Sequence, residues 1–148
     1  MSDQPEFYPM PSFASLAVRD VEASSRWYQE ALGFALVFTM PGPGGAAGLA
    51  HLRWAKYADI LLRASPPLEG RKGVGIALNY AVTDGAIDAL AERARKAGAA
   101  FIQEPGDRPW NARDFTVADP DGFALTFTFG PLKRDMTMGA LVDRIAKS

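Results

Sequence analysis

Few side chains in this sequence could carry out chemistry. The chain has one histidine, His51, and no cysteine, so it offers neither a thiolate nucleophile nor a thiolate metal ligand. One stretch that raises the question of catalysis is RPWNARDFTVADPDGFALTFTFG, residues 108–130, in which Asp119 and Asp121 follow an aromatic loop. Paired carboxylates can act as general acid and base. The order Asp-Pro-Asp-Gly is also typical of a tight turn whose glycine supplies a positive φ, and we interpret the two carboxylates as turn residues.

The composition predicts a globular domain without a nucleic-acid or membrane partner. The chain has 148 residues, enough for one compact domain. Its 16 basic and 17 acidic residues nearly cancel, which leaves no basic surface for phosphate backbones. No apolar run approaches the roughly 20 residues that span a bilayer, and MSDQPEFYPM lacks the basic and then apolar order of a signal peptide. We therefore expect a cytoplasmic protein.

The first part of the chain has the order strand, helix, strand and hairpin. FASLAVRD, residues 13–20, alternates as a strand does, Asp20 is placed to cap a helix through VEASSRWYQEAL, and Gly33 is placed to end it. The strand FALVFTM, the loop PGPGGAAG and the hairpin LAHLRWAKYADILLRA follow. This order predicts a βαβββ module.

The second part repeats this order. GVGIALNYAV, residues 73–82, resembles a strand, Thr83 or Asp84 could cap a helix that ends at Gly98, and AAFIQE, PGDRPWN and a second hairpin follow. We predict an α+β fold with two tandem βαβββ modules in one domain, 1–148. Module one covers about 10–64, a Pro/Gly-rich linker 65–72, module two 73–130, and a C-terminal helix 135–147 with an apolar face of Met138, Leu141, Val142 and Ile145.

Two motifs within this repeat resemble those of a known family. LAVRDVEASSRWYQEALGF in the first module and DPDG in the last hairpin are similar to the vicinal oxygen chelate superfamily, which includes glyoxalases, extradiol dioxygenases, and fosfomycin- and bleomycin-resistance proteins. The resemblance covers about residues 10–130. It implies that the modules form a curled mixed sheet around a cup and that paired modules enclose a ligand site. In many members, His, Gln or Glu side chains from the first and last strands of each module hold a divalent metal there.

The corresponding metal-ligand positions carry no suitable side chain here. They fall at Phe13, Leu61, Thr126 and one of Gly75, Ala77 and Asn79. His51 falls on the third strand, which the family does not use, and without carboxylate or imidazole neighbours at matching positions it would make a weak metal site. We predict no metal and no cofactor, and we interpret His51 as hydrogen-bonded or half-exposed.

The alternation of side chains across a strand also predicts which residues face the cup. In the first, fifth and last strands these positions are mostly small or hydroxyl-bearing, while the opposite face is large and apolar. A roomy cup with a few orienting groups is typical of a small-molecule pocket, and the alternative is a shallow, water-filled sheet face without a ligand. The predicted lining is Phe13, Ser15, Leu61, Arg63, Asn79, Thr126 and Thr128. Asp59 shares the face of Leu61 and Arg63, and could carry rim charge or pair with Arg63.

Three tryptophans complete the candidate residues. Trp27 precedes Tyr28 on the first predicted helix, where we expect both to pack in the core. Trp110 lies in a Pro/Gly-rich loop, where an exposed indole could stack on a planar ligand. The run from Pro109-Trp110 to Asp114-Phe115 resembles the same stretch of metal-free bleomycin-resistance proteins. Trp54 could face either the cup or the core, and we include it with the ligand-binding residues.

These observations predict a metal-independent small-molecule-binding protein of the bleomycin-resistance type, with an aromatic or polycyclic ligand such as an antibiotic. The resemblance also implies a homodimer or a pseudo-symmetric monomer, and in a homodimer the segment FYPMPSF could exchange between subunits. An alternative is a metal-free isomerase, cyclase or lyase that uses Asp59, His51 or Asp114 as acid–base groups. A third possibility, a metal-dependent glyoxalase or dioxygenase, requires ligands that the aligned positions lack.

Overall fold

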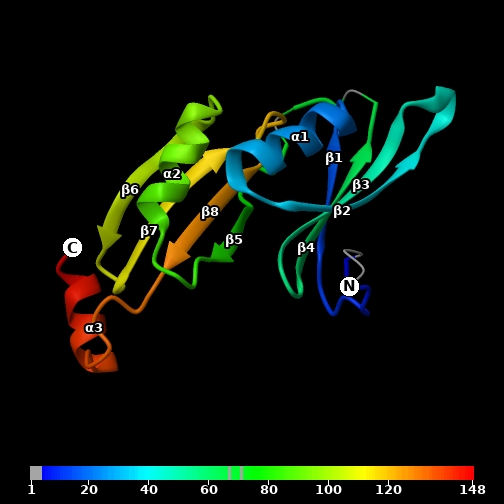
Figure 1. Cartoon of the computed structure of the whole chain (residues 1–148). Helices are drawn as coiled ribbons and strands as arrows, with labels where there is room; N and C mark the ends of the chain where they lie inside the picture. The colour runs from blue at the N-terminus through cyan, green and yellow to red at the C-terminus, as the bar shows by residue number, and fades with distance from the viewer. Residues whose placement is uncertain (1–4, 67, 71) are drawn as a thin grey trace. The chain divides into compact units, whose positions relative to one another are not determined.

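A computed structural model of the chain describes residues 5–66, 68–70 and 72–148. The chain divides into two compact units, residues 1–70 and 71–148, which we call unit 1 and unit 2. This division falls inside the predicted linker. In the described residues each unit contains one four-stranded mixed sheet and at least one α-helix (Figure 1). The predicted α+β class with repeated βαβββ modules is therefore confirmed.

Unit 1 follows the predicted order of elements. They are β1 (Ala14–Val18), α1 (Val21–Leu32), β2 (Ala35–Pro41), the 3-10 turn η1 (Pro43–Gly45), β3 (Ala47–Ala55) and β4 (Ala58–Ala64). The strand order is β1-β4-β3-β2, with β1 parallel to β4 and the other pairs antiparallel. The predicted helix ends are confirmed, because the Asp20 carboxylate accepts a hydrogen bond from Ala23 N at 3.0 Å and Gly33 ends α1 with a φ of 79°.

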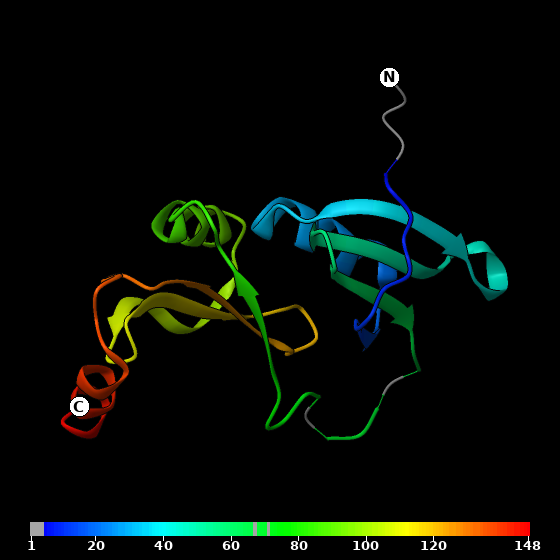
Figure 2. The same cartoon turned by 90° about the horizontal axis from the view of Figure 1, so that it is seen from below.

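Unit 2 repeats this arrangement and adds a helix. Its elements are β5 (Ala77–Ala81), α2 (Ile87–Lys96), β6 (Ala100–Arg108), β7 (Ala112–Ala118), β8 (Ala124–Phe129) and α3 (Met138–Ala146). The strand order is β5-β8-β7-β6, with β5 parallel to β8. In Figure 2, α2 lies along one face of this sheet. The same topology has therefore been built twice from different residues.

Each sheet buries its large apolar residues against the helix of its own unit. In unit 1, Leu52, Ile60 and Leu62 are buried together with Tyr28 and Leu32 of α1. Tyr28 has the predicted core role, and it packs edge-on against the half-buried Trp27, with ring centroids 5.1 Å apart. In unit 2 the corresponding layer contains Tyr80, Phe127 and Phe115, whose rings stack at 5.5 Å. Burying each such side chain contributes about 1.5–3 kcal/mol. We call the other side of each sheet its helix-free face.

Some predicted boundaries in unit 2 are wrong. The strand expected over 73–82 forms only as β5, because Gly73 and Gly75 adopt positive φ and Ile76 N donates to Gly73 O across a turn. Ile76, expected in the core, is 64% exposed. Helix α2 begins after Ala86 rather than after Thr83 or Asp84. The Asp84 carboxylate instead accepts a hydrogen bond from Ala86 N in the preceding turn.

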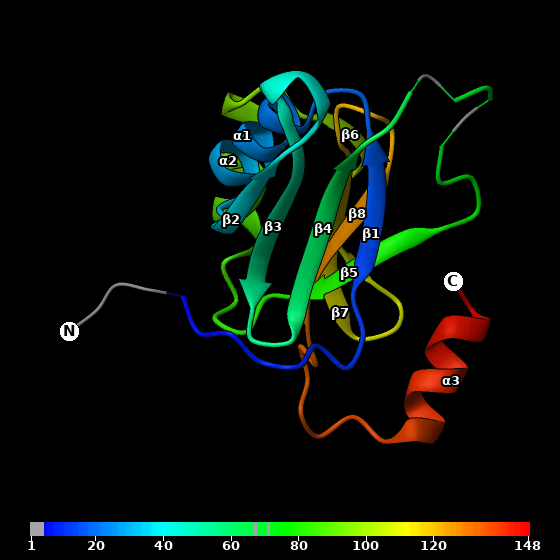
Figure 3. The same ribbon diagram turned by 90° about the vertical axis from the view of Figure 1, so that its right-hand side faces the viewer.

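The last strands and the C-terminal helix also differ from expectation. β6 continues to Arg108, into the predicted loop, and α3 begins at Met138 with Thr137 as its cap. No residue of α3 is buried, so the helix leaves much of its predicted apolar face exposed. Figure 3 shows α3 connected to β8 by a long loop. None of the helices in the described parts of the chain combines the length and apolar character that a membrane crossing requires.

The Asp-Pro-Asp-Gly segment is a turn, as predicted. The Asp119 carboxylate accepts hydrogen bonds from Asp121 N at 2.9 Å and Phe123 N at 2.8 Å. Gly122 N donates to Asp119 O, and Gly122 has a φ of 96°. The Asp121 carboxylate pairs with Lys72 at 3.0 Å. The Asp119 carboxylate is used by the turn and the Asp121 carboxylate by Lys72, so they make no acid–base pair.

Candidate functional site

The helix-free face of each sheet contains one row of four side chains at equivalent positions. Strand pairing aligns Ser15, Leu61, His51 and Phe38 across unit 1. It aligns Asn79, Thr126, Thr116 and Gln103 across unit 2. Side chains two residues apart on a strand share a face, so each row belongs to a larger surface. The predicted site residues Ser15, Leu61, Asn79 and Thr126 occupy these rows.

In unit 1 a buried carboxylate organises this face. Asp59 is 3% exposed and lies opposite Arg53 on the neighbouring strand. His51 Nε2 lies 2.7 Å from Asp59 Oδ2, and Arg53 Nε donates to both carboxylate oxygens at 3.2 and 3.1 Å. The Tyr8 hydroxyl donates to Oδ1 at 2.7 Å. Asp59 therefore receives donors from β3 and from the segment before β1, which satisfies a buried charge.

The N-terminal segment that supplies Tyr8 is anchored near the hairpin between β3 and β4. The hydroxyl of Tyr8 accepts a hydrogen bond from Tyr57 N at 2.8 Å, and the two rings meet edge-on at 4.9 Å. The Arg53 guanidinium lies 4.4 Å from the Tyr8 ring centroid, a cation–π contact. An exposed ion pair between Lys56 and Glu6 adds a further link. Figure 3 shows this segment passing the hairpin end of β3 and β4.

The donors around Asp59 keep it ionised. Burial alone raises the pKa of this carboxyl, but the hydrogen bonds from Tyr8, His51 and Arg53 outweigh burial and hold its pKa below the ordinary 3.8. A carboxylate beside an imidazole orients the ring. His51, 5% exposed, makes only this side-chain hydrogen bond among the described residues. Among the described residues, the only fully buried side-chain polar atom without a hydrogen-bond partner is Ser24 Oγ. His51 Nδ1 has no hydrogen-bond partner in that part of the chain either, so it is not fully buried and retains contact with solvent.

This arrangement corrects two expectations about unit 1. His51 was expected to have no carboxylate neighbour at a matching position, and the structure places Asp59 against it. Asp59 was also a candidate partner for Arg63, but its guanidinium partner is Arg53, directly opposite on β3. The described residues contain no group of three or more His, Cys, Asp or Glu side chains placed to hold a metal ion. The His51–Asp59 pair is of a kind that can move a proton or orient a polar group.

In unit 2 the equivalent row is polar but uncharged. The Thr116 and Thr126 hydroxyls lie 2.7 Å apart. The Asn79 amide donates to Ala77 O at 3.2 Å on its own strand. Thr116 occupies the position of His51, and Ala124 that of Asp59. Hydroxyl and amide groups of this kind can orient a ligand without strong electrostatic attraction.

A hollow of about 750 Å³ lies at one end of the unit 2 sheet. It brings together two predicted ligand-binding residues, Trp110 and Thr128. Trp110 is 49% exposed, which leaves much of its indole available for contact. The hollow is lined by Ala81, Val82, Thr83, Trp110, Asn111, Ala112, Thr128, Phe129, Gly130, Pro131, Leu132, Lys133, Arg134, Met136 and Leu141. Its wall therefore combines apolar and polar side chains.

Asn111 holds one wall of this hollow in place. Its side-chain amide donates to Lys133 O at 2.8 Å, and its side-chain oxygen accepts from Lys133 N at 2.8 Å. Leu132 N donates to Asn111 O at 3.0 Å. Gly130 is required for this close approach, because a β-carbon there would lie 2.9 Å from Asn111 O. The loop after β8 is therefore fixed against the loop that carries Trp110.

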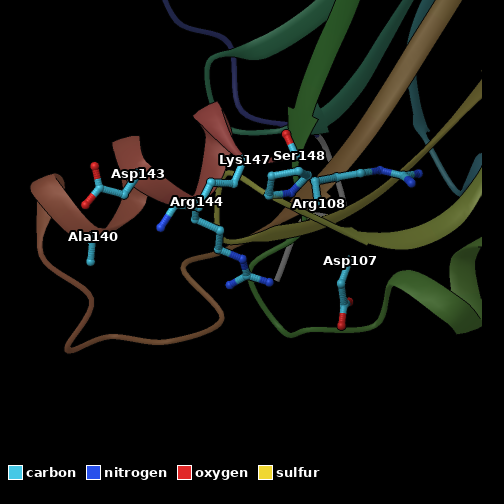
Figure 4. A pocket seen from close by; sticks show the side chains of 8 residues that line it. Asp107, Arg108, Ala140, Asp143, Arg144, Lys147 and Ser148 are labelled. Atoms are coloured by element: carbon cyan, nitrogen blue, oxygen red, sulfur yellow. The ribbon is translucent and has the colours of Figure 1, made fainter.

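A second hollow of about 650 Å³ lies between the end of β6 and α3 (Figure 4). It is lined by Asp107, Arg108, Pro109, Ala140, Asp143, Arg144, Lys147 and Ser148. In Figure 4 the Arg108 side chain extends away from α3, in keeping with its 2.7 Å bond to the buried carboxylate of Asp114. This hollow has no aromatic side chain, so it offers less to an aromatic ligand.

The remaining predicted residues belong to unit 1 and do not line the unit 2 hollow. Trp54 packs on Phe34 at 5.5 Å, and Phe34 packs on Tyr28, so Trp54 belongs to the helix-covered side of unit 1. Phe13 and Arg63 are exposed in unit 1. Several residues at the two sites went unrecognised in the sequence: Tyr8, Arg53, Asn111, Lys133 and Arg134. The pairing of Arg53 with Asp59 follows from the hairpin register, which the spacing of the two residues could have indicated.

Comparison with known proteins identifies the family. The sequence model of the Glyoxalase/Bleomycin resistance protein/Dioxygenase superfamily matches residues 11–127 of this chain. The chain belongs to this superfamily. The match spans both βαβββ units and confirms the predicted membership of the vicinal oxygen chelate superfamily.

Relatives of this superfamily protein come from several bacteria. Protein Mb0911c of Mycobacterium bovis is 30% identical over 131 residues, which cover 83% of this chain and 84% of the relative. The crystal structure of TioX from Micromonospora sp. ML1 matches with a TM-score of 0.62 at 25% identity, covering 79% of this chain and 95% of TioX. The fosfomycin resistance protein FosX from Mesorhizobium loti matches with a TM-score of 0.61 at 18% identity, covering 80% of this chain and 90% of FosX, and shares the fold.

Proposed function

We propose that this superfamily member is a metal-independent small-molecule-binding protein of the bleomycin-resistance type whose ligand is aromatic or polycyclic, such as an antibiotic. The observation that supports this most directly is the hollow in unit 2, where the exposed indole of Trp110 stands beside an apolar wall. An indole face provides stacking area at a small cost in conformational entropy. The cytoplasmic location stays a prediction from the sequence.

The shape and composition of the hollow support this function. Leu132, Met136 and Leu141 offer apolar contact, and the Thr128 hydroxyl offers a hydrogen bond. A volume of about 750 Å³ is within the range of pockets that hold drug-sized ligands. The loop beside it is fixed by Asn111, so less conformational entropy is lost when a ligand binds. The predicted lining residues Asn79 and Thr126 lie on the helix-free face of the same unit.

Metal independence rests on the side chains at the positions where relatives hold their ion. Phe13, Leu61 and Thr126 offer no strong ligand for a divalent cation. The fifth-strand alternatives are glycine, alanine and asparagine. Elemental analysis of protein purified without chelator tests this point, and near-stoichiometric divalent metal would contradict it.

A thermal-shift screen with matched variants tests the binding function. Glycopeptide and polycyclic aromatic antibiotics are added at increasing concentration. A true ligand stabilises the folded chain, and so raises the melting temperature, with the logarithm of its free concentration relative to Kd. At 100 times Kd the stabilisation is about 2.7 kcal/mol. Trp110→Ala should lose most of this shift and Trp110→Phe should retain part of it. Trp27→Phe, in unit 1, is the control that should leave the shift unchanged. If every aromatic compound leaves the melting temperature unchanged, the proposal fails.

A second candidate function, a metal-free isomerase or lyase, is favoured by the His51–Asp59 pair. Nε2 faces the carboxylate and Nδ1 retains solvent contact, an arrangement that can take up and return a proton. Any compound found in the thermal-shift screen can be incubated with the protein in D₂O and followed by NMR. Exchange of a carbon-bound proton that disappears in His51→Gln would support catalysis. A compound recovered without exchange or conversion would favour binding alone.

We also propose that the protein forms a homodimer. The apolar side chains of Met138 and Val142 on α3 are exposed, with 56% of Val142 accessible to solvent. Exposed apolar surface of this kind is typical of a subunit contact. Sedimentation equilibrium should give twice the monomer mass for the native chain, and Val142→Asp should shift the mass toward the monomer. A native chain that sediments as a monomer would contradict the dimer.

A further inference from the structure

We infer that the unit 2 hollow selects an aromatic anion, so that its ligand carries a carboxylate or another negative group beside the ring system. This rests on the proposed binding function and adds the charge of the ligand. Two cationic residues, Lys133 and Arg134, line the hollow together with Trp110, and no Asp or Glu lines it. The chain as a whole has a net charge of −1, so this local excess of positive charge is opposite in sign to the whole protein.

Among the described residues, Lys133 and Arg134 are not paired with a carboxylate, whereas several other cations of the chain are. Ion pairs neutralise Arg53, Lys56, Lys72, Arg95, Arg108 and Arg113. Within residues 5–66, 68–70 and 72–148, neither Lys133 nor Arg134 has an ion pair or a side-chain hydrogen bond to a protein group. Their donors are therefore available to a ligand. Lysine offers a compact charge and arginine a planar fork that matches a carboxylate.

The main chain that carries these cations is held by the protein. Asn111 binds both the N–H and the C=O of Lys133, and Leu132 N binds Asn111 O. Asn111 itself is buried and has a φ of 66°, an unusual backbone conformation for a non-glycine residue. The same residue follows Trp110 directly. One buried side chain thus fixes the spacing between the aromatic surface and the positive charges, which is the spacing that an aromatic anion would have to match.

Three probes with the same ring system test this charge preference. They are 2-naphthoate, 2-naphthalenemethanol and 2-naphthylmethylammonium, titrated into the full chain by isothermal calorimetry. We expect 2-naphthoate to bind about tenfold or more tightly than the alcohol, because a charged hydrogen-bond pair contributes about that factor. The ammonium probe should bind most weakly. The preference should shrink as the salt concentration rises, since both cations are on the surface.

Charge-removing variants locate the preference. Lys133→Gln combined with Arg134→Gln should bring 2-naphthoate and the alcohol to within about twofold of each other. Arg144→Gln combined with Lys147→Gln, in the second hollow, removes the same charge and should leave the preference intact. If the three probes bind equally in the native chain, the charge inference is wrong while the proposed function stands. If Trp110→Ala does not weaken any probe, or no probe binds, the hollow is not the site and the proposed function fails with it.

Discussion

Unit 1 and unit 2 have the same strand order and equivalent pairing, and they differ most in the side chains of the helix-free face. In unit 1 the face carries His51, Arg53 and Asp59, joined by hydrogen bonds and closed by Tyr8 from outside the sheet. In unit 2 the equivalents of Arg53, His51 and Asp59 are alanine or threonine. The charged groups of unit 1 are already satisfied by one another.

This difference indicates that two units can share one topology and still differ in the side chains that could bind a ligand. The buried layers of both units are apolar because each must pack against its helix, although unit 2 has stacked aromatic rings where the sheet of unit 1 has aliphatic side chains. The helix-free faces are free of that requirement. The face of unit 1 holds the Asp59 network, and the face of unit 2 holds the buried Arg108–Asp114 ion pair and also places the Thr128 hydroxyl beside the hollow. In unit 2 the available groups lie near Trp110 and the hollow. We therefore propose that the ligand binds in unit 2.

Removing the central carboxylate of unit 1 should have the largest effect on stability. Asp59→Asn removes the negative charge and replaces one of the two acceptor oxygens that Arg53, His51 and Tyr8 share by an NH₂ donor, and breaking a buried pair in this way costs about 3–5 kcal/mol. Urea unfolding followed by circular dichroism measures the change. Asp88→Asn, which removes one partner of an exposed pair with Arg113, is the matched control and should change stability much less. Equal losses in both variants would show that the Asp59 network is not stabilising.

The same carboxylate should make stability depend on pH in the acid range. The pKa of Asp59 is lower in the folded chain than its ordinary 3.8, so its contribution is complete above that value and is lost as pH falls through the folded pKa. The stability difference between the native chain and Asp59→Asn should therefore shrink between about pH 5 and pH 2. Urea unfolding at several pH values tests this. A difference that stays constant over the range would contradict the depressed pKa.

The equivalent row of unit 2 should show a smaller effect. Thr126→Val removes the hydroxyl that pairs with Thr116 at 2.7 Å and leaves a buried Thr116 hydroxyl without that partner. The expected loss is about 1 kcal/mol, the usual contribution of one neutral hydrogen bond. Thr128→Val, which removes a hydroxyl on the same strand, is the control for the change in shape. A loss as large as that of Asp59→Asn would mean that the two faces are equally important to stability.

Much of the fold could be predicted because its signals are local. Asp20 and Gly33 mark the ends of α1, and alternation separates Leu125 and Phe127 on the helix side from Thr126 on the other. Thr83 and Asp84 were poor guides to the start of α2, since a turn before Ala86 used the Asp84 carboxylate instead. Local propensity could not show whether the Asp84 carboxylate would cap α2 or stabilise the turn before it, because the surrounding structure decides between these two uses.

The candidate site was harder to predict because it depends on contacts between distant segments. Tyr8 reaches Asp59 across 51 positions of sequence, and Asn111 binds Lys133 across 22. Neither pair has a spacing that a helix or strand period would reveal. Trp110 and Thr128 could be predicted because an aromatic in a loop and a hydroxyl at an alternating position are each unusual on their own. Lys133 and Arg134 had no such signal before the loop was placed.

The most direct test of ligand binding in unit 2 is an NMR titration of ¹⁵N-labelled protein with 2-naphthoate. The three tryptophans give three indole N–H signals, which single substitutions to phenylalanine assign. The account predicts that the Trp110 indole signal and the amide signals of Leu132 and Lys133 shift with a common saturation curve, while the Trp54 indole and His51 amide stay in place. Shifts confined to unit 1, with Trp110 unmoved at saturation, would contradict it.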